Sequence, residues 1–162
     1  MKIIDIKDED IINYKVTSMF IITSKCSFKC DKESGLNICQ NSALAHSPII
    51  DFDDERIVER YISNPISHAI VFGGLEPLDQ FDELVALISK FRKKTKAMIV
   101  IYTGYNEDEI PEQLKILSGL TNIIVKFGRF IPNDKHHKDK LLGVELASSN
   151  QYAKKLRRED YV

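Results

Sequence analysis

Apolar residues along the chain occur in short continuous runs that are separated by amphipathic segments. Four runs rich in β-branched residues are predicted to be strands buried on both faces: 16–23, 68–72, 97–103 and 122–126. Three segments with apolar residues every three or four positions are predicted to be helices: 51–63, 78–94 and 107–117. Helices that alternate with buried strands in this way indicate an α/β fold with a mostly parallel sheet, either open or forming part of a barrel.

The 162 residues contain no Pro- or Gly-rich linker and no internal repeat, so we expect a single domain over residues 1–162. Its core is expected over residues 16–126, and residues 127–162 are expected to form a closing segment of loops with one strand or helical turn. The acidic N-terminal stretch does not match a signal peptide, and no apolar run approaches the roughly 18 residues of a membrane span. A cytoplasmic protein without a membrane partner is the resulting expectation.

The charge balance bears on the choice of partners. The chain has 23 Lys and Arg against 24 Asp and Glu, a net charge of −1, which indicates no nucleic-acid partner. Nine Lys and Arg against five Asp and Glu nevertheless fall within residues 126–162. This segment is either a solvated basic tail or a docking surface, beside the functional site, for an acidic partner or a nucleotide-handling protein. Four side chains would steer such docking: Lys154, Lys155, Arg157 and Arg158.

All three cysteines lie close together, at Cys26, Cys30 and Cys39. An odd number of cysteines without secretory features does not fit a disulfide framework, and clustered thiols favour a metal or an iron–sulfur cluster. A structural zinc site needs four ligands, and none of the four histidines stands at a zinc-finger spacing. Three thiolates suit a [4Fe–4S] cluster whose fourth iron stays open for a small molecule. Incidental thiols are the alternative, although this loop is polar and cysteine is normally buried.

Unusual segments follow the predicted strands at their carboxyl ends, where function gathers in parallel sheets. The cysteine segment, with CSFKC at 26–30 and NICQN at 37–41, follows the first strand. FGGLEPL at 72–78 follows the second strand, and IYTGY at 101–105 spans the end of the third. These elements, together with GRFI and SSNQ near the C-terminus, resemble the radical S-adenosylmethionine (SAM) superfamily. Within it, the chain is most similar to the small activating proteins of anaerobic ribonucleotide reductase, and the resemblance runs from about residue 16 to residue 152.

The chain departs from the pattern of that family at several positions. The spacing C-x3-C-x8-C is longer than the usual one, as though residues 31–36 were inserted, and Leu75 interrupts Gly-Gly-Glu. Ile38 and Gln40 flank the last cysteine where the family commonly has an aromatic residue and a histidine. We expect residues 31–36 to form an external bulge that returns at Gly35.

The resemblance implies the fold, the cofactors and their contacts. It implies an open, partial (β/α) barrel of the radical SAM type, with a [4Fe–4S] cluster on the three cysteines and SAM on the open iron. The cofactors carry the chemistry, so no further catalytic side chain is expected. The expected contacts to SAM are Ile38, Gln40, Gly73, Gly74, Glu76, Thr103 and Lys126. A solvated turn carboxylate, an ordinary strand-end threonine and a solvated lysine are the alternatives for Glu76, Thr103 and Lys126. Arg129, Ser149 and Asn150 are further candidates for closing the pocket.

The function implied is that of an activating enzyme, a radical SAM oxidoreductase. It would place a glycyl radical on the catalytic subunit of an anaerobic ribonucleotide reductase, with flavodoxin or ferredoxin as the electron donor. Two alternatives stay open at this point. One is a radical SAM enzyme that acts on a peptide or small molecule, and the other is a non-catalytic, metal-binding regulatory module.

Overall fold

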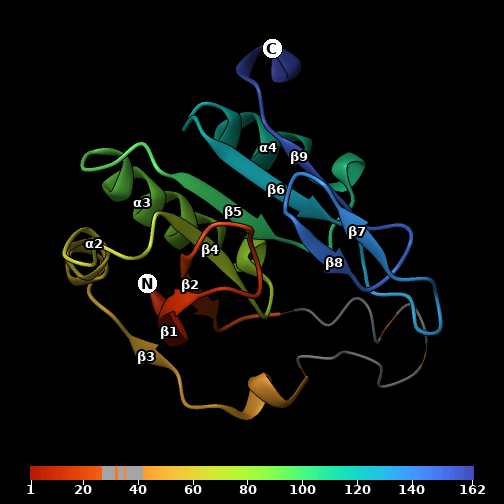
Figure 1. Ribbon diagram of the computed structural model, residues 1–162, viewed down its shortest axis with the longest axis horizontal. Coiled ribbons are helices and arrows are strands. Elements are labelled where there is room, and N and C mark those ends of the chain that lie inside the picture. Colours follow the sequence, from red (N-terminus) through yellow and green to blue (C-terminus); the bar gives the residue numbers. More distant parts are fainter. Residues whose placement is uncertain (27–31, 33–34, 36–41) are drawn as a thin grey trace.

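A seven-stranded sheet forms the centre of the molecule, in the order β3-β1-β2-β4-β5-β6-β9 (Figure 1). The computed structural model describes residues 1–26, 32, 35 and 42–162. The strands of this sheet are β1 (Lys2–Asp10), β2 (Ser18–Thr23), β3 (Ile50–Asp51), β4 (Ala69–Gly74), β5 (Met98–Tyr102), β6 (Ile123–Phe127) and β9 (Tyr152–Lys155). Strands β2, β4, β5 and β6 are parallel, whereas β1, β3 and β9 pair antiparallel with their neighbours. The fold is therefore mixed α/β with a mostly parallel sheet, and the barrel is not closed.

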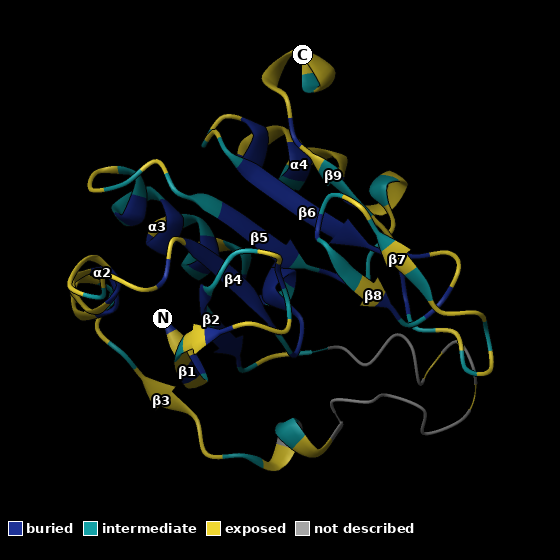
Figure 2. Ribbon diagram, viewed as in Figure 1, coloured by how far each residue is buried: buried dark blue, intermediate teal, exposed yellow. Residues whose placement is uncertain are grey.

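Helices cover one face of the sheet, and a β-hairpin covers part of the other. The helices are α2 (Asp54–Ile62), α3 (Phe81–Arg92) and α4 (Pro111–Ser118), with short 3-10 helices η1 (Ser42–His46), η2 (Pro77–Gln80), η3 (Glu107–Glu109) and η4 (Arg158–Tyr161). The hairpin consists of β7 (His137–Asp139) and β8 (Val144–Leu146). Figure 2 shows that the central strands are buried between these layers, whereas the outer sides of the helices are exposed.

Alternate residues of the central strands supply two cores. Ile21, Phe72 and Ile101 belong to the core that packs against α2, α3 and α4. Val71 and Val100 point to the opposite face, in the core that includes residues from the β1–β2 connection and from the hairpin. This burial on both faces is the physical reason that the parallel strands are continuous apolar runs in the sequence.

The four predicted strands and three predicted helices are confirmed, with shifts at their ends. The segment 107–117 divides into η3 and α4 because Pro111 starts a new helix, a position where its missing N–H costs nothing. Strand β1 was not predicted, because register shifts interrupt the alternation that would identify it. Three strands follow Phe127 where one strand or helical turn was expected, and each is too short to show a period.

Among the described residues, none of the helices combines the length and the apolar character that crossing a bilayer requires.

Candidate functional site

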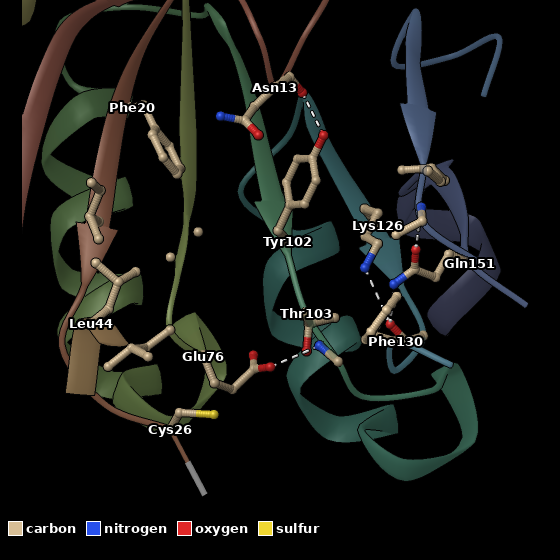
Figure 3. Close-up of a pocket in the computed structure, with 18 of the residues that line it drawn as sticks. Asn13, Phe20, Cys26, Leu44, Glu76, Tyr102, Thr103, Lys126, Phe130 and Gln151 are labelled. Atoms are coloured by element: carbon tan, nitrogen blue, oxygen red, sulfur yellow. Dashed lines mark hydrogen bonds between the residues drawn. The ribbon is translucent and has the colours of Figure 1, made fainter. Parts of the chain in front are cut away.

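A cavity of about 500 Å³ lies at the carboxyl ends of the four parallel strands, on the face opposite the helices (Figure 3). Its floor is formed by Ile22, Gly73, Tyr102 and Lys126, one from each strand. The strand register places Ile22 beside Gly73 and Tyr102 beside Lys126. A Cβ atom on Gly73 would lie 3.0 Å from the Phe20 ring and 3.6 Å from Cβ of Tyr102, so the glycine hollows the floor between two aromatic side chains.

The loops after the parallel strands, η1 and the end of the hairpin supply the walls of the cavity. They bring together residues that lie far apart in the sequence: Cys26, Leu44, Leu75, Glu76, Thr103, Gly104, Gly128, Phe130, Glu145, Leu146, Ala147 and Gln151. Five of the seven predicted SAM contacts line this one cavity together with Cys26: Gly73, Gly74, Glu76, Thr103 and Lys126. Ile38 and Gln40 lie outside the described residues.

Cys26 is partly buried at the wall of the cavity, directly after β2. Thiolate is the donor that iron–sulfur clusters use, so this side chain fits the predicted ligand. Cys30 and Cys39 lie outside the described residues, as does most of the predicted bulge at 31–36. Gly35 is described, and it is exposed with φ +68°, a conformation that suits a tight return. Within the described ranges, no three His, Cys, Asp or Glu side chains are grouped so that they could hold a metal ion.

Gly74 occupies a position that only glycine fits. Its φ is +91°, and a Cβ atom there would lie 2.4 Å from Cγ2 of Ile22. The second glycine of the pair therefore lets β4 end against β2 without a clash. The first glycine, Gly73, also accepts a hydrogen bond on its carbonyl oxygen from the Thr23 hydroxyl at 3.1 Å.

Glu76 is buried, with only 7 % of its surface exposed, and it bridges two strand-end loops. One carboxylate oxygen accepts from the amide of Leu78 at 3.1 Å and the other from the amide of Gly104 at 2.8 Å. Burial raises the pKa of Glu76 to about 7, although these two amides and the Thr103 side chain oppose the rise. The alternative of a solvated turn carboxylate is therefore wrong. Figure 3 shows the side chain reaching across toward Thr103.

We expect Glu76 to make stability depend on pH. Because its pKa is about 7 in the folded chain and near 4.5 in the unfolded chain, the folded state holds the proton more often between these values. Raising the pH through this window therefore lowers the free energy of unfolding, by about 2–3 kcal/mol between pH 5 and pH 8. Glu76→Gln should remove this part of the pH dependence. Urea unfolding of both proteins at the two pH values measures the difference, and parallel pH profiles would refute the assignment.

Thr103 and Lys126 are buried as well. The Thr103 hydroxyl oxygen accepts from the amide of Tyr105 at 3.0 Å. The Lys126 ammonium donates to the carbonyl of Gly128 at 3.2 Å and lies 5.7 Å from the centre of the Tyr102 ring. The alternative of a solvated strand-end lysine is wrong, since this charge is held at the floor of the cavity.

Other lining residues were not identified from the sequence. Tyr102 donates its hydroxyl to the carbonyl of Asn13 at 2.6 Å, and burial raises the pKa of Tyr102 above its ordinary value. Gln151 donates to the carbonyl of Gly128 at 3.2 Å and accepts from the amide of Ala147 at 3.0 Å. The bond to Gly128 attaches the closing segment to the end of β6. The local sequence does not mark the roles of Tyr102 and Gln151, because the bond from Tyr102 to Asn13 spans 89 residues and the bond from Gln151 to Gly128 spans 23.

The remaining candidates stabilise the closing segment and do not line the cavity. Arg129 forms an ion pair with Glu109, with its Nη2 2.5 Å from the carboxylate. The Asn150 amide donates to the carbonyl of Arg129 at 2.8 Å, and the Ser149 hydroxyl donates to Asp134 at 2.5 Å.

The basic segment 126–162 supplies part of the cavity wall, for example through Gly128, Phe130 and Gln151. The four side chains expected to steer docking lie on or after β9 and do not line the cavity, so a docking role for them stays a prediction. Strand β9 runs antiparallel to β6, with Lys155 beside Ile124, so the chain leaves the carboxyl edge of the sheet from Tyr152 onward. Figure 1 shows the C-terminus far from the end of β2. Lys154 and Arg157 also form ion pairs within the chain, with Glu107 and Asp160.

Comparison with known proteins identifies one family. A family model described as a 4Fe-4S single cluster domain matches residues 15–153, from just before β2 into β9. The match includes all three cysteines and the carboxyl ends of the four parallel strands. Comparison with curated proteins and with solved structures gave no significant match.

Proposed function

The chain belongs to the 4Fe-4S single cluster domain family, and on this premise we propose that it binds a [4Fe–4S] cluster through Cys26, Cys30 and Cys39 and cleaves SAM. The observation that carries the proposal is the position of the cavity. Cys26 and Thr103 follow β2 and β5, the Gly73-Gly74 pair ends β4, and all of them line the same cavity. A volume of about 500 Å³ is in the range of sites for small molecules, which suits a cofactor of the size of SAM.

The residues of the chain would bind and orient SAM. A reduced cluster held by the three cysteines would supply the electron for reductive cleavage of SAM, and the bound SAM would supply the radical chemistry. Lys126 places a positive charge at the cavity floor, where it would attract the carboxylate of SAM. Gly73 and Gly74 let a ligand approach the backbone, and their carbonyl oxygens would accept from its ammonium group. The partly buried aromatic side chains Phe20, Tyr102 and Phe130 and the buried Ile22 would limit the access of water to the bound cofactor.

The substrate proposed is a backbone glycine of an anaerobic ribonucleotide reductase catalytic subunit, with flavodoxin or ferredoxin as the electron donor. Support comes from the resemblance over residues 16–152 and from the cavity, which opens at the carboxyl edge of the sheet. A peptide that enters there would place its glycine close to a SAM molecule bound beside Cys26.

Gly73→Ala is expected to weaken SAM binding at least about tenfold and to leave cluster content unchanged. The added methyl group enters the cavity floor at 3.0 Å from the Phe20 ring, and overpacking of this kind costs about 1–3 kcal/mol. Equilibrium dialysis of labelled SAM against the reconstituted protein measures the loss. Gly119→Ala is the matched control, since this glycine follows α4 and does not line the cavity. Equal SAM affinity for both variants would contradict the proposed position of SAM.

The proposed substrate has its own test. The reduced protein is incubated with SAM and a candidate reductase subunit, and electron paramagnetic resonance (EPR) is used to look for a glycyl radical. A radical signal that depends on SAM supports the proposal. SAM cleavage without any radical on the reductase would point to a different peptide or small-molecule substrate, whereas one zinc and no sulfide would indicate a non-catalytic module.

A further inference from the structure

Gln80 is a buried residue whose side-chain amide does not serve its own helix. It directly precedes α3, at the position from which side chains often cap a helix, yet its amide forms no capping hydrogen bond. Only 3 % of its surface is exposed. A buried amide must find partners elsewhere, because an unsatisfied polar group is costly.

The partners of Gln80 lie at the start of the cysteine segment and at the start of the chain. Its oxygen accepts from the amide of Ser24 at 2.8 Å and from the Ser24 hydroxyl at 3.3 Å. Its nitrogen donates to the carbonyl of Lys2 at 2.8 Å and to the Glu83 carboxylate at 3.4 Å. These four bonds use both acceptor sites and both donors of the amide. The side chain is therefore fully committed to joining β1, α3 and the residue that follows β2.

Lys25, which follows Ser24, is held by the same short segment as Ser24, residues 76–80. The amide of Glu76 donates to the carbonyl of Lys25 at 2.7 Å, so residues 76–80 bind both Ser24 and Lys25. Cys26 follows directly. The Glu76 carboxylate also accepts from the amide of Gly104, which ties the same segment to the loop after β5.

We infer that residues 76–80 form a clamp that fixes the backbone immediately before Cys26, with Gln80 as its positioning residue. This inference rests on the proposed role of Cys26 as a cluster ligand. The clamp sets where the first thiolate enters the cavity relative to the loops after β4 and β5. Gln80 does not line the cavity, and its hydrogen bonds reach Ser24, so its effect on Cys26 passes along the main chain through Ser24 and Lys25.

The test uses Gln80→Met, which keeps the length of the side chain and removes its hydrogen bonds. No helix cap is lost with it, since Gln80 provides none. Hydrogen exchange of the Glu76 amide is measured on the reconstituted full chain by mass spectrometry with fragmentation to single residues. This amide bonds to Lys25 and not to Gln80, so it reports whether the clamp acts as a unit. We expect its exchange to become about tenfold faster, as for the loss of one hydrogen bond.

Leu117→Ala is the matched control for a general loss of stability, because it removes buried atoms of α4 that belong to the core on the helix face. Gln80→Met should accelerate exchange at Glu76 and change the EPR spectrum of the reduced cluster, whereas Leu117→Ala should do neither. An unchanged exchange rate at Glu76 in Gln80→Met, or the same acceleration in both variants, would overturn the clamp. The exchange is measured without SAM, so a failure to cleave SAM would refute the proposed function and not the clamp.

Discussion

Cys26→Ala is expected to abolish binding of the iron–sulfur cluster, and with it all SAM cleavage. The thiol lies at the cavity wall, and three cysteines leave no spare thiol in the chain to replace it. The fold should survive, since Cys26 is only partly buried and follows the end of β2. Iron and sulfide analysis after anaerobic reconstitution measures the effect, with circular dichroism to confirm folding.

Lys25→Ala is the matched control for Cys26→Ala. Its side chain is exposed, and the clamp uses only its main-chain carbonyl, so cluster content should match that of the original protein. Cys39→Ala should also lose the cluster, a prediction that comes from the sequence alone because this residue lies outside the described ranges. A full, SAM-responsive cluster in either cysteine variant would exclude that residue as a ligand.

Gly74→Ala is expected to lower the free energy of unfolding by about 2–4 kcal/mol. The cost has two parts, the strain of a side chain at φ +91° and the clash of the new Cβ with Ile22 at 2.4 Å. Gly35→Ala isolates the first part, because Gly35 has φ +68° and a Cβ there would meet nothing within 4 Å. Urea unfolding compares the two variants.

A second substitution tests the clash itself. Ile22→Ala removes the methyl group that the new Cβ would strike, so the double variant with Gly74→Ala should be more stable than the sum of the two single losses predicts. A loss in Gly74→Ala no greater than in Gly35→Ala, or strict additivity with Ile22→Ala, would contradict the proposed contact.

The sequence predicts those elements of the fold in which apolar residues recur at a regular spacing. The parallel strands are apolar throughout because both of their faces are buried, and the helices carry one apolar stripe each. Strand β1 is not predicted, because register shifts interrupt the alternation of its buried and exposed residues. Strands β7, β8 and β9 are too short to show such an alternation.

The residues of the candidate site also differ in whether the sequence reveals them. Cys26 and the glycine pair are visible in the sequence because their residue types are unusual at the ends of strands. The burial of Glu76 is not visible, because it depends on the amide of Gly104, 28 residues away. The positioning role of Gln80 is not visible either, because its partners Ser24 and Lys2 lie 56 and 78 residues away along the chain. Residue type identifies a candidate, whereas its role follows from contacts that only the folded chain supplies.

We propose that this iron–sulfur protein cleaves SAM, and product formation tests this proposal most directly. The protein is reconstituted with iron and sulfide without oxygen, reduced in the presence of SAM, and assayed for 5′-deoxyadenosine by chromatography and mass spectrometry. We predict that 5′-deoxyadenosine and methionine form in equal amounts, and that neither forms with Cys26→Ala. A fully loaded, reducible cluster that yields no 5′-deoxyadenosine would contradict the claim.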